Sequence, residues 1–199
     1  VNDKEGLFAS MDDGLYQVHS VDEIDQITFD YVWSVRSSSL FPNTLFEATI
    51  DGIELLSKGE NKWKKTGRIA PLNFEVRFFE IEGDSIIWCA NDHKLLVKYE
   101  IKNKELNNGK VIVCDSLMGK RKTANLWPKY IGDSLIFYGD DGIFNYKKNH
   151  FEKVSWFNDA EYTNIHRVES DDKNGLWIVH FNEEGQFRIT HITFEDGVG

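Results

Sequence analysis

GLFASMDDGLY at residues 6–16 is the first of five degenerate copies of one phrase in this chain. Each copy holds a bulky apolar pair, a few polar residues, and a glycine or its substitute before another apolar residue. The other copies are TLFEATIDGIE at 44–54, IIWCANDHKLL at 86–96, LIFYGDDGIF at 135–144 and GLWIVHFNEEGQF at 175–187. Their aromatic anchors are Phe8, Phe46, Trp88, Phe137 and Trp177, which lie 38, 42, 49 and 40 residues apart. A recurrence at this period indicates a repeat protein.

The residues around each anchor are typical of β-strands. Aromatic and β-branched residues alternate there with polar ones, and turn residues such as Asp-Asp-Gly separate the runs. About 40 residues suffice for four short strands joined by tight turns, which is the size of one propeller blade. We therefore predict an all-β fold, a β-propeller or partial propeller of about five four-stranded blade repeats, in one domain over residues 1–199. The repeats are expected at 1–30, 31–70, 71–120, 121–160 and 161–199.

The two ends of the chain and the long third repeat depart from this scheme. Residues 1–6 resemble the turn between a first and a second strand, so we expect the first repeat to lack its inner strand. The last repeat stops at FEDGVG, where an outer strand should follow. We therefore expect a fragment of a larger propeller, or a chain that closes irregularly. Residues 102–110 are interpreted as a polar insertion between the third and fourth strands of the third repeat.

Composition excludes several classes of protein. Acidic residues outnumber basic residues by 33 to 23, and the net charge of −10 argues against nucleic acid as a partner of this segment. No apolar run approaches the roughly 20 residues that a membrane-spanning helix needs, so we predict no membrane span in this segment. Cys89 and Cys114 are expected on the second and fourth strands of one repeat. That separation exceeds the reach of a disulfide, so we expect two free, buried thiols.

Three stretches carry a resemblance to a known family: IHRVESDDKNGLWIVHFNEEG at 165–185, VRFFEIEGDSIIWCAND at 76–92 and TLFEATIDGIELLSKGENKWKKTGRI at 44–69. They resemble the two-component regulator propeller repeat, in which a Val-Arg and acidic stretch precedes an Asp-x-x-Gly-x-Leu-Trp turn and a short Gly-Leu-Tyr strand. The chain departs from that pattern in places. The Gly-Thr after the anchor is mostly missing, Phe replaces Trp in three copies, and Lys94 replaces the glycine in the third.

The resemblance implies a function and a location. Members of that family form the sensor region of hybrid two-component histidine kinases, or of transcriptional regulators with a triple-tyrosine module, especially in Bacteroidetes. It implies a noncatalytic sensor in signal transduction and transcription regulation, in the periplasmic or extracellular part of a membrane-anchored bacterial protein. The implied ligand is an oligosaccharide or another small molecule, and the implied self-association would occur through the parent protein.

Motifs for chemistry are sparse. The acidic turns lack the downstream Glu and the spacing of an EF-hand, and Asp, Asn and Gly are what tight hairpins require. The six histidines are scattered without a cluster that suits zinc, and no phosphate-binding Gly-rich loop or nucleophile elbow occurs. We therefore predict no catalytic residue, no metal and no cofactor. Two alternatives stay open: a polysaccharide-active or lyase-type propeller enzyme, with His166 the one histidine expected on an inner strand, and a protein-binding scaffold.

Tryptophans and acidic turns supply the candidate site. Trp88 and Trp177 recur at the phase of the repeat, so we expect both in the core. Aromatic faces beside carboxylates and amides suit a sugar ring, although packing between blades explains tryptophans at the start of inner strands equally well. Six residues expected near one mouth of the central channel are the candidate ligand-binding residues: Trp33, Asp92, His93, Trp127, Asp140 and Asp141.

Overall fold

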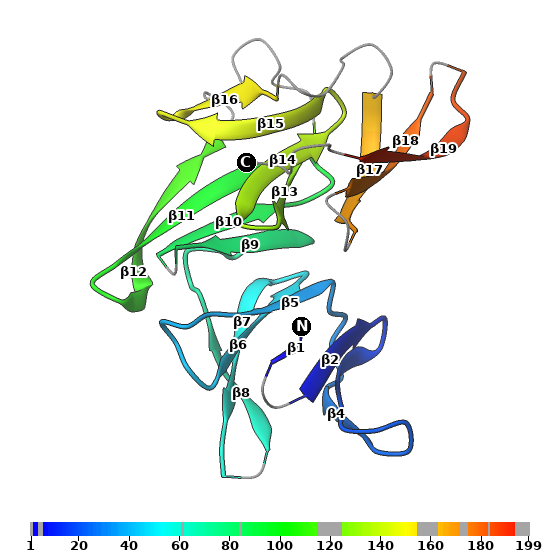
Figure 1. Ribbon diagram of the computed structural model, residues 1–199. Helices are drawn as coiled ribbons and strands as arrows, with labels where there is room; N and C mark the ends of the chain where they lie inside the picture. Colours follow the sequence, from blue (N-terminus) through cyan, green and yellow to red (C-terminus); the bar gives the residue numbers. More distant parts are fainter. Residues whose placement is uncertain are drawn as a thin grey trace. The chain divides into compact units, whose positions relative to one another are not determined.

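The computed structural model describes residues 2–3, 6–60, 62–83, 85–114, 125–154, 163–171, 175–182 and 184–193. Over these residues the chain forms β-strands and turns, and no α-helix (Figure 1). This part of the chain therefore has no helix of the length and apolarity that crossing a membrane requires. It divides into two compact units, residues 1–91 with 97–112, and residues 92–96 with 113–199.

The first unit contains sheets A and B and nearly all of sheet C, each antiparallel and each built from strands that are consecutive in sequence. Sheet A comprises β1 (Asn2–Asp3), β2 (Gly6–Met11), β3 (Gly14–Val18) and β4 (Ile24–Thr28). Sheet B comprises β5 (Ser34–Ser37), β6 (Thr44–Thr49), β7 (Gly52–Lys58) and β8 (Trp63–Arg68). Sheet C comprises β9 (Phe78–Glu82), β10 (Ile86–Ala90), β11 (Leu96–Lys102) and β12 (Glu105–Val113).

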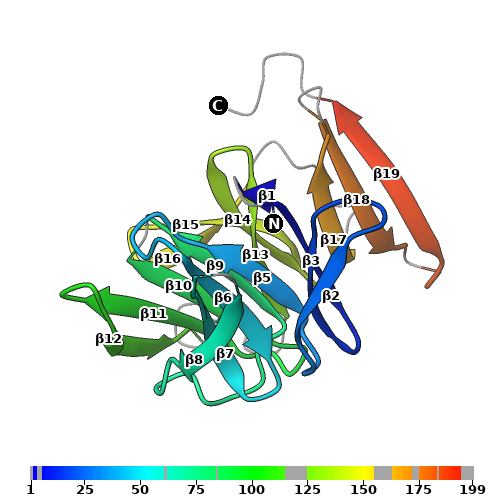
Figure 2. The ribbon, with the colours of Figure 1, turned by 90° about the horizontal axis from the view of Figure 1, so that it is seen from below.

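The second unit contains sheets D and E. Sheet D comprises β13 (Leu126–Ile131), β14 (Ser134–Gly139), β15 (Gly142–Lys147) and β16 (His150–Lys153). Sheet E comprises β17 (Thr163–Ser170), β18 (Gly175–Phe181) and β19 (Phe187–Thr193), which lie side by side in orange and red in Figure 2. Every sheet falls inside one predicted repeat. The predicted fold class is confirmed, because the chain is all-β and consists of β-propeller blades.

Two details of the prediction were wrong. The first repeat retains an inner strand, since β1 pairs Asn2 with Leu7 and Asp3 with Gly6. Sheet E has three strands among the described residues, which agrees with a last repeat that stops before its outer strand. Residues 102–110 are no insertion, because they form most of the β11–β12 hairpin. The end of the last repeat, at 194–199, lies outside the described residues, and the expectations of one domain and of a longer parent stay predictions.

The hairpin of sheet C is held by a tyrosine rather than by turn glycines. Its turn uses Asn103 and Lys104 in the left-handed region, with φ of 54° and 59°. The buried Tyr99 donates its hydroxyl proton to the carbonyl of Leu106 at 2.7 Å. Its ring fills the place of a side chain at Gly109, where a Cβ atom would lie 2.2 Å from the ring. Glycine at position 109 therefore allows the tyrosine to close the hairpin.

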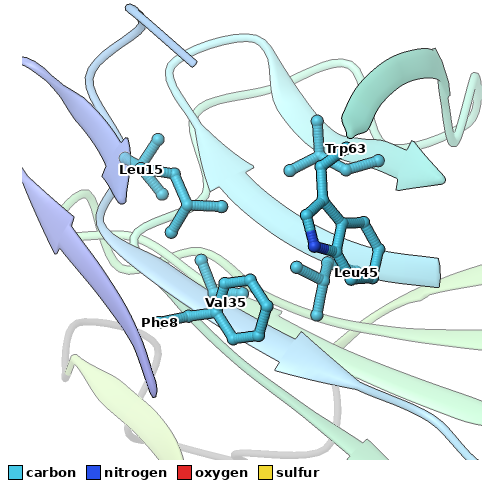
Figure 3. Packing of buried hydrophobic residues seen from close by; sticks show 7 residues of the cluster. Phe8, Leu15, Val35, Leu45 and Trp63 are labelled. Carbon is cyan, nitrogen blue, oxygen red and sulfur yellow. The ribbon is translucent and has the colours of Figure 1, made fainter. Parts of the chain in front are cut away.

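Sheets A and B share a hydrophobic core (Figure 3). Phe8 and Leu15 of sheet A pack with Val35, Leu45 and Trp63 of sheet B. The rings of Phe8 and Trp63 meet edge to face, with centroids 5.6 Å apart at 87°. Edge-to-face pairs add to the stabilisation that burial provides, so this contact joins the two sheets.

The anchors and the cysteines were predicted to be buried. Trp88 is fully buried as expected, whereas Trp177 is 46% exposed, which contradicts the prediction that it is a core residue. Its side chain projects from a face of β18 that stays open to solvent. Cys89 on β10 and Cys114 just beyond β12 are free, buried thiols, as predicted. Burial raises the pKa of the Cys89 thiol far above its usual range.

Candidate functional site

Asn125 joins two of the predicted acidic turns in the second unit. The Oδ2 atom of Asp140 accepts hydrogen bonds from the backbone N of Asn125 at 2.9 Å and from its Nδ2 at 3.3 Å. The Oδ1 atom of Asn125 accepts a hydrogen bond from the backbone N of Lys94 at 3.1 Å. The turn that carries Asp92 and His93 is thereby held beside the turn that carries Asp140. Both Asp92 and His93 are exposed.

The backbone of the third repeat explains why Lys94 takes part in this contact. Lys94 has a φ of 64°, in the left-handed region that side chains rarely adopt. The copies in sheets A, B and D have glycine at the matching turn, with φ of 148° at Gly14, 121° at Gly52 and 118° at Gly142. Lys94 therefore also has a positive φ at this place in the repeat, although with a different value from those of the glycines, and the hydrogen bond to Asn125 helps hold a conformation that glycine would adopt freely.

Asp140 and Asp141 are adjacent but differ in their contacts. The side chain of Asp140 accepts the two hydrogen bonds from Asn125. Its backbone carbonyl accepts a third hydrogen bond, from the backbone N of Asn164 at 2.9 Å. The side chain of Asp141 makes no hydrogen bond or ion pair within the described part of the chain. The first aspartate of the pair therefore organises the turns, whereas the assignment of the second to ligand binding stays a prediction.

Replacing Asp140 by alanine is expected to lower the free energy of unfolding by about 1–2 kcal/mol, because two hydrogen-bond donors of Asn125 lose their acceptor. Asp141→Ala should change it by less than about 0.5 kcal/mol and serves as the matched control. Chemical denaturation measures both values. Amide exchange at Lys94 should also be faster in Asp140→Ala alone. Equal effects of the two substitutions would contradict this role of Asp140.

Trp127 lies on β13 but is only 6% exposed. Its ring packs against Tyr138 of the same sheet, with centroids 5.5 Å apart, and against His166 of sheet E, with centroids 6.3 Å apart. The indole thus joins sheet D to sheet E. Its assignment to ligand binding stays a prediction, and a ring with so little exposed surface offers little area for stacking on a sugar.

Trp33 belongs to the first unit and centres a group of four side chains, here called the Trp33 cluster: Tyr31, Trp33, Glu75 and Arg77. The guanidinium of Arg77 lies 5.0 Å from the centre of the Trp33 ring. The Tyr31 ring meets Trp33 at 5.2 Å and 64°, and Arg77 Nε donates to Glu75 Oε1 at 2.8 Å. Tyr31 is 46% exposed and Trp33 is half-buried. The cluster is therefore an accessible surface of aromatic and charged groups.

Backbone pairing places this cluster. Trp33 immediately precedes β5, and its backbone N–H donates a hydrogen bond to the carbonyl of Ala48. In the same way, Arg77 immediately precedes β9, and its backbone N–H donates to the carbonyl of Ala90. The Ser34 hydroxyl donates to the Arg77 carbonyl at 3.3 Å, which ties sheet B to sheet C. Sequence reasoning missed Tyr31 and Arg77 as site residues. The signal was that Trp33 and Arg77 hold the same position, just before the inner strand, in successive repeats.

Glu47 and Glu54 form a buried carboxyl pair directly opposite each other on β6 and β7. They are 0% and 2% exposed, and the Thr28 hydroxyl of sheet A donates to Glu47 Oε1 at 2.8 Å. Lys65 forms ion pairs with Glu54 and, at 3.1 Å, with Asp30. Burial is the main cause that raises the pKa of Glu47 to about 7. The pair lies in the packing between two sheets, where a polymeric substrate has no access.

Other features that bear on chemistry are few. His166 is exposed on β17, the inner strand of sheet E, and its ring contacts those of Trp127 and Phe181. No group of three or more His, Cys, Asp or Glu side chains suited to a metal ion occurs in the part of the chain that the structure describes. A hollow of about 410 Å³, lined by Gly59, Glu60, Lys62 and Lys64, lies at the tip of the β7–β8 hairpin.

The comparisons with known proteins bear on the fold. No protein-family model and no curated protein sequence matches the chain. Among solved structures, the chain is similar to the extracellular domain of the putative one component system BT4673 from B. thetaiotaomicron, with a TM-score of 0.61 and 15% sequence identity. The likeness covers 94% of this chain and 26% of that one, so the chain spans about a quarter of the length of its neighbour. At this identity the likeness supports the fold.

Proposed function

We propose that this chain is a noncatalytic ligand-recognition module in the extracytoplasmic sensor region of a bacterial regulator, and that the Trp33 cluster binds an oligosaccharide. Two observations support the sensor role. The structural neighbour is described as the extracellular domain of a one component system, and three stretches of the chain resemble the two-component regulator propeller repeat. The accessible Trp33 cluster is the observation that carries the binding proposal.

The chemistry of the cluster suits a sugar ring. Pyranose rings have an apolar face and a rim of hydroxyls, so they are bound by aromatic side chains flanked by hydrogen-bonding groups. Arg77 supplies N–H donors and Glu75 supplies carboxylate acceptors beside the rings of Tyr31 and Trp33. Because Arg77 covers one face of the indole, Tyr31 and the outer side of the guanidinium provide most of the surface for the ligand.

The noncatalytic part of the proposal rests on the carboxyl groups. Glycoside hydrolysis needs two carboxyls on opposite sides of an accessible glycosidic bond. Glu47 and Glu54 face each other but are buried between sheets. In the Trp33 cluster, Glu75 is engaged by Arg77. The arrangement therefore favours recognition over bond cleavage.

Isothermal titration of the chain with a panel of neutral and uronate-containing oligosaccharides tests the proposal. Tyr31→Ala is expected to weaken the binding of a panel member at least about tenfold, because an exposed stacking ring is lost. Phe187→Ala, which removes an exposed aromatic ring from sheet E, is the matched control and should leave the affinity unchanged. Equal binding by Tyr31→Ala and wild type, or no binding to any panel member by folded protein, would overturn the assignment. Release of new reducing ends would instead show an enzyme.

A further inference from the structure

The segment that joins β4 to β5 is fastened at both ends to β6. It comprises residues 28–33 and carries both aromatic rings of the Trp33 cluster. At its start, the buried Thr28 donates a hydrogen bond from its hydroxyl to Glu47 Oε1 on β6 at 2.8 Å. At its end, the backbone N–H of Trp33 donates to the carbonyl of Ala48, the next residue of β6. Glu47 and its neighbour therefore help hold the two rings in place.

The middle of this segment is fastened to the same place by a lysine. Asp30 forms an ion pair with Lys65 of β8 at 3.1 Å, and Lys65 also forms an ion pair with Glu54 of β7. Glu54 lies directly opposite Glu47 in the register of β6 and β7. Tyr31 follows Asp30 in the sequence and is exposed. The position of the Tyr31 ring therefore depends on contacts that end at the Glu47–Glu54 pair.

The charges around Glu47 do not balance when every carboxyl is ionised. Among the described residues, three carboxyl groups share one ammonium there: Glu47 on β6, Glu54 on β7, Asp30 on the segment, and Lys65 on β8. Val35, opposite Glu47 on β5, is apolar, and Arg68, opposite Glu54 on β8, is exposed. Glu47 Oε2 is buried and has no hydrogen-bond partner in the described part of the chain. An ionised Glu47 therefore has no cation of its own.

Protonation of Glu47 removes this imbalance. Burial is the main cause that raises the pKa of Glu47 to about 7, while the hydrogen bond from Thr28 lowers it and the charge of Glu54 raises it further. Loss of the proton places a second negative charge in the packing between sheets A and B, where a charge is costly until water reaches it. Residues 29–31 are already exposed, so opening of the segment lets water reach Glu47 while the two sheets stay packed.

We propose that Glu47 and Glu54 form a pH-sensitive switch that controls the Trp33 cluster. With Glu47 protonated, the segment 28–33 is closed on β6 and the two rings of the cluster are held together. When Glu47 loses its proton, the Thr28 contact breaks, the segment opens and Tyr31 leaves the cluster. The control of binding rests on the function proposed above, because it needs a ligand at the cluster, whereas the opening of the segment does not.

Amide exchange at two reporter positions, followed by NMR, tests the opening. The backbone N–H of Leu15 donates to the Thr28 hydroxyl at 3.2 Å and that of Trp33 donates to Ala48, so both are released when the segment opens. Opening exposes Glu47 and returns its pKa from about 7 toward 4.5, so opening increases as pH rises between these values. From pH 5 to pH 8, the protection factors of both amides should fall at least about tenfold, since this difference in pKa permits up to about 300-fold.

Variants distinguish the switch from a general loss of stability. Glu47→Gln should keep the same protection at pH 8 as at pH 5, and Glu184→Gln, at an exposed site, should follow wild type. Thr28→Val should speed exchange at Trp33 already at pH 5, whereas Thr28→Ser, which keeps the hydroxyl, should retain the pH profile. Reporter protection that is independent of pH, or that falls equally in Glu47→Gln, would overturn the proposal. So would an equal fall at the Arg77 amide, which is bonded within sheet C and reports unfolding of the whole unit.

Titration with a neutral oligosaccharide of the panel tests the control of binding. Tyr31 is in place only when the segment is closed, so the apparent dissociation constant should be at least about threefold higher at pH 8 than at pH 5. Glu47→Gln should bind equally at both pH values. An affinity that does not change with pH while the segment opens would overturn the control of binding. If folded protein binds no panel member, the proposed function fails, whereas amide exchange still decides whether the switch exists.

Discussion

Replacing Trp88 by alanine is expected to lower the free energy of unfolding by about 3–5 kcal/mol, the usual cost of removing a fully buried aromatic side chain. Trp88 is 0% exposed, and its Nε1 donates a hydrogen bond to Glu82 Oε2 at 2.7 Å. The Lys98 ammonium also lies 5.6 Å from the ring centre. Alanine leaves a cavity, deprives the carboxylate of a donor and removes a cation–π contact. Denaturant unfolding followed by circular dichroism measures the loss.

Trp177→Ala is the matched control, because the two tryptophans hold the same position in the repeat. With 46% of Trp177 exposed, its removal should cost less than about 1 kcal/mol in dilute, monomeric protein. Because residue type and repeat position are the same in both variants, the difference between their losses of unfolding free energy measures the effect of burial. Equal losses would show that the Trp177 ring is buried in solution, and would contradict its exposed position on β18.

Stability is expected to fall as pH rises from about 4.5 to about 7, through the titration of Glu47. The pKa of Glu47 is raised in the folded chain, so the folded state binds the proton more tightly than the unfolded state. The contribution is complete below the unfolded pKa of 4.5 and is lost as pH rises to the folded pKa of about 7. At about 1.4 kcal/mol per pKa unit, the rise from 4.5 to about 7 corresponds to a loss of up to about 3.5 kcal/mol.

Glu47→Gln isolates this contribution from those of other groups. Glutamine mimics the protonated carboxyl, so the variant should match wild type below about pH 4 and exceed its stability at pH 8. Glu184→Gln removes a carboxyl from an exposed position and should follow the wild-type pH profile. Unfolding curves at several pH values provide the comparison. A constant difference between Glu47→Gln and wild type across this range would refute the linkage.

The strands of this protein could be predicted wherever the residues of a turn, such as Asp-Gly, mark it in the sequence. The Asp-Gly turns at Gly52 and Gly142 have the positive φ that glycine allows, and the strands on both sides of each were expected. The turn at Asn103 and Lys104 carries no such signal, so the β11–β12 hairpin was interpreted as an insertion. What holds that hairpin is Tyr99 against Gly109, a contact between strands that no local pattern displays.

The candidate site was predictable only in part, because its contacts join distant residues. The turns at Asp92 and Asp140 were expected to lie near each other, but the role of Asn125 in joining them was missed. The sequence singles out Trp33 as an aromatic residue at the start of an inner strand. Its contact with Arg77, 44 residues away, depends on how sheet B packs on sheet C.

The sequence by itself determined the period, the strands and most turns, because these depend on side chains and backbone angles within a few residues. It did not determine which apolar and charged groups are buried. Trp88 and Trp177 are equivalent in the repeat, yet one is fully buried and the other is 46% exposed. Glu47 has its raised pKa because sheet A covers it. Burial depends on which sheet covers a given face, and only the tertiary structure decides that.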